Sequence, residues 1–142
     1  MQRHRAGYTI DTRRERLPME IIVGWLGTTY WAATRPPEAI RRSWDNSPVV
    51  FGLYCGEEIA GWARVVTDSV AIAYLADVFL VPEHRGRGLG LWLVETIVAH
   101  PELSGVRWLL HTDDAHGLYR RVGFTEVDAA RVLERPRPAP PR

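Results

Sequence analysis

The sequence lacks the residue patterns that form disulfides or membrane-spanning helices. A single cysteine, Cys55, excludes an internal disulfide and any metal site made of several cysteines. No apolar run approaches the roughly 20 residues of a membrane-spanning helix. The start, "MQRHRAGYTI", carries positive charge without the apolar stretch of a signal peptide. We therefore expect no membrane association and a cytoplasmic location.

An excess of charge is also lacking. The formal net charge is +1 at pH 7, which argues against a general nucleic-acid-binding protein but leaves room for a local anion site. A length of 142 residues fits one domain with a sizeable core. We predict a single domain over residues 1–134. The remaining stretch, "RPRPAPPR" (135–142), is too rich in proline for a helix or strand and predicts an extended, flexible tail.

Hydrophobic periodicity predicts a mixed α+β fold. Helical spacing, proline at first-turn positions and glycine stops predict helices over 17–27, 35–46, 90–100 and 113–124, the last capped by Asp113 or Asp114. Apolar or alternating runs bounded by turn residues predict strands over 7–12, 71–81, 106–112 and 124–133, and a hairpin over 48–67. The run at 71–81 is almost entirely apolar, which is typical of a strand covered on both faces.

The stretch "VPEHRGRGLGLW" (81–92) places three glycines and two arginines between a strand and a helix. The first-turn N–H groups of a helix lack intrahelical partners and carry partial positive charge. Glycines let an anion approach these groups, and Arg85 and Arg87 add charge, so the stretch predicts a phosphate-binding loop. A glycine-rich turn without a ligand is the alternative.

Two familiar phosphate motifs do not match this loop. The dinucleotide fingerprint fails because its third glycine position holds Leu91, and no Gly-Lys-Ser/Thr follows for a P-loop. The pattern Arg85-x-x-Gly88-x-Gly90 instead resembles the pyrophosphate loop of the GNAT superfamily of acyl-CoA-dependent N-acyltransferases. The stretch "AHGLYRRVGF" (115–124) resembles the second signature of that family. The two signatures and their spacing cover about residues 50–128.

The resemblance implies a fold and a cofactor site. It implies a twisted mixed sheet of about six to seven strands, flanked by about four helices, whose central strands splay apart around the pantetheine arm of acetyl-CoA. The implied contacts are the backbones of Phe79 and Val81 for pantetheine, and Arg85, Gly86, Arg87, Gly88, Leu89 and Gly90 for the pyrophosphate. Many members have asparagine where this chain has Thr112, which can still hydrogen-bond the pantetheine arm.

Acetyl transfer to an amine requires a proton acceptor for the amine and a proton donor for the departing thiolate. The resemblance places a phenol at Tyr119 as the donor; a core aromatic is the alternative for that residue. Asp77, a carboxylate within an apolar strand, is the candidate base and shares a face with Phe79 and Val81 by alternation. The alternative is a structural aspartate paired with an arginine such as Arg64.

The acceptor site is the least specific part of the sequence. Tyr30, Trp31 and Trp62 are candidates for the wall of an amine pocket, aided by Asp68 or Asp77, because aromatic faces and carboxylates favour cations. Core packing is the alternative for the tryptophans.

The remaining histidines give no sign of a metal. His84 is expected at the surface, His111 near the cleft as a possible proton relay, and His116 on the last helix. No metal-ligand spacing unites them, so we predict no metal.

Two functions remain open. The first is N-acetyl transfer from acetyl-CoA to a primary amine, on a small molecule or a protein amino group, by direct attack. The second is a non-catalytic acyl-CoA-binding sensor or interaction module. In both cases we expect a monomer or homodimer without nucleic-acid partners.

Overall fold

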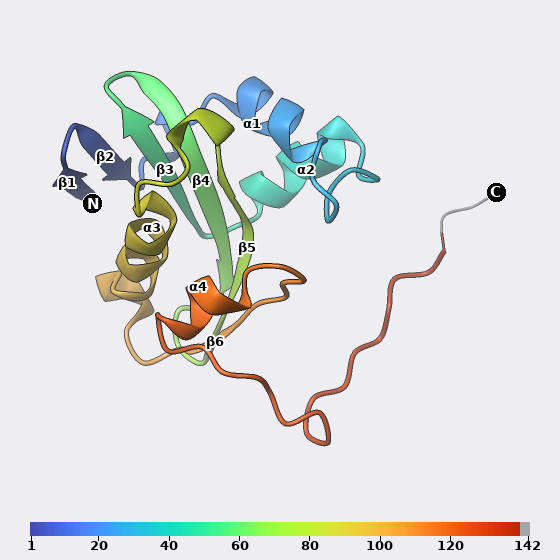
Figure 1. Ribbon diagram of the computed structural model, residues 1–142. Helices are drawn as coiled ribbons and strands as arrows, with labels where there is room; N and C mark the ends of the chain where they lie inside the picture. Colours follow the sequence, from blue (N-terminus) through green and yellow to red (C-terminus); the bar gives the residue numbers. More distant parts are fainter. Residues whose placement is uncertain (140–142) are drawn as a thin grey trace.

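The computed structural model describes residues 1–139, which fold around one six-stranded sheet (Figure 1). The strands follow the chain in the order β1-β2-β3-β4-β5-β6, antiparallel except for the parallel pair β5–β6. The strands are β1 (Gln2–Arg5), β2 (Tyr8–Asp11), β3 (Val49–Cys55), β4 (Glu58–Thr67), β5 (Ile72–Leu80) and β6 (Arg107–Leu109). The helices are α1 (Met19–Leu26), α2 (Pro37–Asp45), α3 (Leu89–Val98) and α4 (His116–Arg120). This confirms the predicted fold class.

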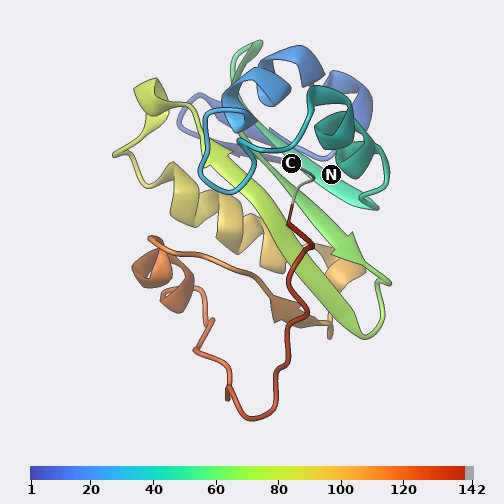
Figure 2. The ribbon, with the colours of Figure 1, turned by 90° about the vertical axis from the view of Figure 1, so that its right-hand side faces the viewer.

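Helices cover both faces of the sheet. Figures 1 and 2 show α1 and α2 on one face and α3 and α4 on the other. Each face has its own apolar core: Trp44 and Trp62 belong to the α1–α2 side, and Phe51 and Leu93 to the α3 side. The helices therefore bury both sides of the central strands, which explains the long apolar runs in the sequence.

A β-bulge in β5 changes which side chains face which core. Trp62 pairs with Phe79, but Arg64 pairs with Ala76, so one β4 residue opposes two residues of β5. Asp77, at the bulge, has φ +55°, and such an extra residue reverses the alternation of the strand. Leu75 consequently packs in the α3-side core and Phe79 in the α1–α2-side core.

The β5 and β6 strands separate soon after they meet. Their parallel pairing covers Ile72–Tyr74 and Arg107–Leu109 only, whereas β5 continues to Leu80. Within residues 1–139, no strand pairs with the rest of this β5 edge. Its backbone groups are available to a bound ligand.

Two predictions about secondary structure were wrong at the C-terminal end. Residues 124–133 do not form a strand: they pair with no strand of the described chain and expose Val127 and Leu133. Helix α4 begins at His116 rather than after an aspartate cap; the N–H of Ala115 instead donates to Thr112 Oγ1 at 3.0 Å. The strand β1 was not predicted, because its residues are exposed and polar.

The proline-rich segment has no helix or strand over residues 135–139, and residues 140–142 lie outside the described residues. Within the described residues, no helix has the length and apolar character that crossing a membrane requires. The domain boundary at residue 134 stays a prediction.

Asp11 carries a pH-dependent part of the stability of this fold. Its side chain is fully buried, and it accepts hydrogen bonds from Arg13, Gln2 and Arg16. Burial by itself would raise the pKa of Asp11, but the hydrogen bonds from Arg13, Gln2 and Arg16 together hold it well below its usual range. Because the pKa is lowered on folding, this stabilisation is present above the unfolded-state pKa and is lost as the pH falls through the folded-state pKa.

We expect Asp11→Asn to lower the free energy of unfolding by about 2 kcal/mol at pH 7, and by progressively less as the pH falls below about 4. Urea unfolding at pH 7, 4 and 3 measures this difference, with the exposed Asp45→Asn as the control. An equal loss at all three pH values would contradict the assignment.

Candidate active site

The glycine–arginine loop leads directly into the start of α3. Gly86 and Gly88 adopt left-handed φ values of +78° and +75°, and a Cβ built at either would meet no atom within 4 Å. Gly88 is the N-cap of α3, and no side chain caps the helix. The first-turn N–H groups of α3 are therefore open to an anion, as the phosphate-loop prediction requires.

The two arginines of the loop are held differently. Arg85 donates from Nε to the carbonyl oxygen of Leu80 at 2.9 Å and lies over the Phe79 ring at 5.2 Å. Arg87 is exposed, and no ion pair is found for it within the described chain. Arg85 is thus tied to the end of β5, whereas Arg87 can move toward a ligand.

The hydrogen bonds of β5 favour pantetheine contacts one residue away from those that the resemblance implies. The N–H of Val81 donates to the carbonyl oxygen of Ala60 at 2.8 Å, so it is already used in the sheet. Phe79 pairs with β4 and has the same orientation as Val81, because residues two apart on a strand direct their backbone groups to the same side. Leu80 lies between these two residues and Val78 precedes them, so the backbone groups of Val78 and Leu80 are directed to the unpaired edge. The carbonyl oxygen of Leu80 already accepts from Arg85 Nε there, and the N–H of Leu80 remains for a ligand.

A cavity of about 470 Å³ lies beside this edge. Its walls come from β5, the loop before α4, α4 itself, the segment after α1, and the chain near residue 135. The residues are Tyr30, Trp31, Arg35, Arg64, Tyr74–Val78, His111–Ala115, Tyr119 and Glu134–Arg137. Figure 2 shows the C-terminal segment crossing in front of this side of the sheet. We did not predict that the C-terminal segment would form part of the cavity wall, because its composition indicates only an extended chain.

Tyr119 stands between this cavity and a second one of about 720 Å³, because it lines both. The residue is 9% exposed, and no described residue accepts or donates a hydrogen bond at its hydroxyl. Burial, with smaller contributions from Tyr30 and Asp114, raises the pKa of Tyr119 to about 12. The phenol therefore keeps its proton at neutral pH.

Asp77 is enclosed by donors. Arg64 Nε lies 2.7 Å from Oδ2, and Trp31 Nε1 and Arg35 lie 3.0 and 3.3 Å from Oδ1. The carboxylate is only 1% exposed although its residue borders the cavity. These contacts favour the structural alternative, an aspartate paired with Arg64, over a base that meets the amine.

The three aromatic candidates for the acceptor pocket do not lie together. Tyr30 and Trp31 pack edge to face, with ring centroids 5.0 Å apart, on the cavity wall. Trp62 has no exposed surface and stacks on Phe79 in the core, so its assignment to the pocket was wrong. Trp62 does not line the cavity.

The remaining polar candidates lie in different parts of the structure, and only some of them reach the cavity. Asp68 caps the turn before β5 by accepting from backbone N–H groups, and it does not line the cavity. His111 Nδ1 lies 2.6 Å from the Tyr74 hydroxyl at the cavity, and His116 is exposed at the start of α4. His84 is buried, which contradicts the expected surface position, because its ring packs against Tyr8.

Comparisons with known proteins agree with this geometry. The family model described as Acetyltransferase (GNAT) family matches residues 19–124. A crystal structure of a GNAT-family protein from Xanthomonas campestris pv. campestris is 38% identical, with a TM-score of 0.87, over 95% of this chain and 96% of that one. A Gibberella zeae protein named "Putative acetyltransferase" is 30% identical over 86% of this chain and 81% of its own length.

The names of two further matches mention a small molecule. A Corynebacterium glutamicum protein named mycothiol acetyltransferase is 30% identical over 74% of this chain. The matched part covers 38% of that relative's own length. A Clostridium acetobutylicum structure described with acetyl-CoA has a TM-score of 0.67 at 14% identity, over 88% of this chain and 96% of that one, and so shares the fold. From the family model and the first two relatives, we conclude that this chain belongs to the GNAT acetyltransferase family.

Proposed function

We propose that the chain transfers the acetyl group of acetyl-CoA to the nitrogen of a primary amine. The observation that carries the proposal is the continuity of three features: the unpaired edge of β5, the uncapped start of α3, and a cavity that ends at a protonated phenol. The pantetheine arm would lie along Val78 and Leu80, and its pyrophosphate would accept hydrogen bonds from the N–H groups at Gly88–Gly90.

The reaction requires one bond to form and one to break. The amine nitrogen attacks the thioester carbon, and the C–N bond forms while charge gathers on the acetyl oxygen, which accepts a hydrogen bond from the N–H of Val78. The C–S bond then breaks, and the thiolate takes the proton of the Tyr119 hydroxyl. Tyr119 recovers its proton from the cavity, where Tyr30 lies near Asp114.

The amine must arrive without its extra proton. Asp77 is a poor candidate to remove it, since all of its nearby donors are arginine or tryptophan groups that it already binds. We propose that Asp77 positions Trp31, and that the proton leaves through water toward the exposed carboxylates Asp113, Asp114 and Glu134 at the cavity wall. The same carboxylates would attract a cationic acceptor, whether a small amine or a protein amino group.

The direct test is thiol release from acetyl-CoA with a panel of amines. Acetylation of the protein's own lysines cannot interfere with this assay, because the chain has 18 arginines and no lysine. The N-terminal amine is part-buried and bonded to Thr12. The thiol of Cys55 is measured separately with Cys55→Ser. Binding of acetyl-CoA without amine-dependent thiol release would favour the non-catalytic acyl-CoA-binding module instead.

We expect Gly88→Ala to weaken CoA binding by about 10- to 100-fold, the loss of one charge-assisted hydrogen bond. The new Cβ would occupy the open space beside the first-turn N–H groups of α3. Gly105→Ala is the matched control, since Gly105 has a similar φ of +83° and equally open surroundings. Both variants should lose about 1–2 kcal/mol of stability through the left-handed backbone. Calorimetry that shows equal CoA affinity for the two folded variants would contradict the loop assignment.

A further inference from the structure

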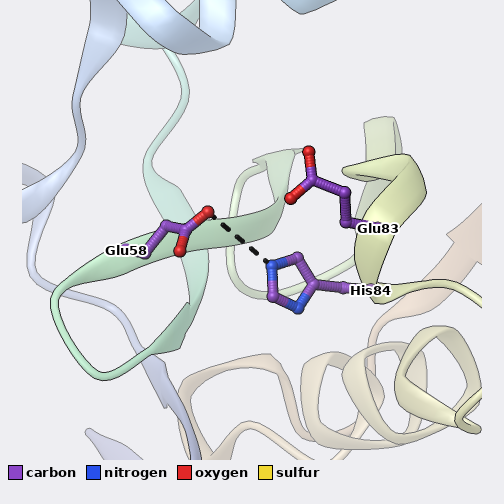
Figure 3. Close-up of side chains that lie close together, drawn as sticks. All are labelled: Glu58, Glu83 and His84. Atoms are coloured by element: carbon purple, nitrogen blue, oxygen red, sulfur yellow. Dashed lines mark ion pairs between the residues drawn. The ribbon is translucent and has the colours of Figure 1, made fainter.

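Three potential metal ligands meet on the side of the sheet where β4 begins and β5 has just ended. Glu58 is the first residue of β4, and Glu83 and His84 lie in the short 3-10 turn Pro82–His84 that follows β5. One ligand atom from each lies within 4.8 Å of the others. Figure 3 shows the two carboxylates and the imidazole directed toward a common space.

His84 is the unusual member of this cluster. Its side chain is 10% exposed, and Nδ1 lies 2.8 Å from the Tyr8 hydroxyl. Nε2 is buried and has no hydrogen-bond partner among the described residues; Glu58 Oε1 lies 4.0 Å away. A buried polar atom without a hydrogen-bond partner destabilises the folded state. Some group that occupies the space between Nε2 and the glutamates would remove this cost.

The chemistry around Nε2 favours a cation as that group. Two carboxylates and an imidazole nitrogen are a common ligand set for Zn²⁺ and similar divalent metals. When Nδ1–H donates to the Tyr8 hydroxyl, the lone pair of Nε2 points toward the glutamates, and this second hydrogen bond fixes the ring as metal-bound histidines require. Neither glutamate has an arginine partner within residues 1–139.

The spacing permits binding with small movements. Tetrahedral Zn²⁺ with ligands at about 2.1 Å places its donor atoms roughly 3.4 Å apart. Both glutamates are exposed and can close from their present separations by side-chain rotation, whereas the imidazole stays in place. We propose that Glu58, Glu83 and Nε2 of His84 bind one divalent transition-metal cation, with water completing its shell.

Such a cation would link the first residue of β4 to the turn that follows β5, next to the last hydrogen bond between Val81 and Ala60. Glu58 lies at the end of the β3–β4 turn, and His84 immediately precedes Arg85 of the phosphate-binding loop. The bound metal would therefore fix the entrance to that loop, away from Tyr119 and the cavity beside β5. This site is distinct from the reaction, and it revises the prediction from the sequence, which found no metal-ligand spacing among His84, His111 and His116 and therefore expected no metal.

The test is calorimetric titration of the untagged full chain with ZnCl₂, together with its thermal unfolding midpoint. We expect one equivalent to bind and the midpoint to rise. Glu58→Gln and Glu83→Gln should each weaken binding at least tenfold, because each removes a ligand charge at an exposed position that folding tolerates. Glu57→Gln, in the same turn but outside the cluster, is the matched control and should bind as the parent does.

A Cys55→Ser background removes the one thiol that competes for Zn²⁺. The proposal is overturned if no saturable binding occurs in this background. It is equally overturned if Glu58→Gln and Glu83→Gln bind Zn²⁺ as tightly as the parent does, because the metal would then lie at another site of the chain. A histidine ¹⁵N spectrum adds an independent readout: Nε2 of His84 should shift on Zn²⁺ addition, and an unchanged signal would also overturn it.

Discussion

Tyr119→Phe is expected to lower kcat for acetyl transfer by at least about 100-fold, the usual loss when a general acid is removed. The substitution keeps the aromatic ring and its edge-to-face contact with Phe124 at 5.7 Å, but it deletes the only proton that the residue can donate. Because burial raises the pKa of Tyr119 to about 12, the parent retains this proton over the whole neutral and mildly alkaline range. The loss should therefore be uniform from pH 6 to 9.

The matched control is Tyr54→Phe. Burial also raises the pKa of Tyr54 to about 12, and its hydroxyl is buried without a partner, but it belongs to the core beneath α1 and α2. We expect kcat to be unchanged in this variant. Rates are measured as amine-dependent thiol release under single-turnover conditions, where the chemical step is observed. A Tyr119→Phe enzyme with parental kcat would assign the proton to water or another residue.

Asp77→Ala is expected to lower the free energy of unfolding by about 3–5 kcal/mol. The substitution removes the carboxylate between Arg64 and Arg35 and leaves two guanidinium groups, 12% and 18% exposed, without their anion. It also removes the acceptor of Trp31 Nε1, which holds that ring on the cavity wall. Urea unfolding at neutral pH measures the loss.

A double-mutant cycle separates the ion pair from general damage to the bulge. Asp77→Asn keeps the shape of the side chain, and Arg64→Gln removes its closest cation, 2.7 Å away. We expect the double variant to be more stable than the sum of the single losses predicts, because no unpaired charge remains. If Asp77→Asn instead keeps its stability and loses the acidic limb of the pH–rate profile, Asp77 acts as the base.

Local sequence determined most of the helices and strands. The start and stop of α1 and α2 follow from proline, helical spacing and the residues after each helix, and these act within one or two turns. Gly86 and Gly88 were predicted to leave room for an anion, and the structure adds that both adopt a left-handed backbone, which favours glycine. Tyr119 was predicted as the proton donor because it lies within a short signature on one helix, and this role stays a prediction.

Contacts between distant segments decided the rest. The bulge at Asp77 depends on the register with β4, so Leu75 and Phe79 pack in different cores although alternation counted along the sequence places them on one face. The resemblance gave Phe79 and Val81 as pantetheine contacts, but the N–H of Val81 is bonded to Ala60 within the sheet. The partners of Asp77 include Trp31 and Arg35, more than forty residues earlier in the chain. No periodicity encodes such pairings, because hydrogen bonds between strands and long-range ion pairs depend on which segments meet.

The histidine and the last predicted strand show the same division. His84 is polar and follows a proline, which indicates an exposed turn, but packing against Tyr8 buries it and directs Nε2 toward Glu58. Residues 124–133 have an apolar content compatible with a strand, yet a strand forms only where a neighbouring edge supplies hydrogen-bond partners. Composition and local spacing thus determined what each segment of this protein can become, and the tertiary structure decided which surfaces those segments share.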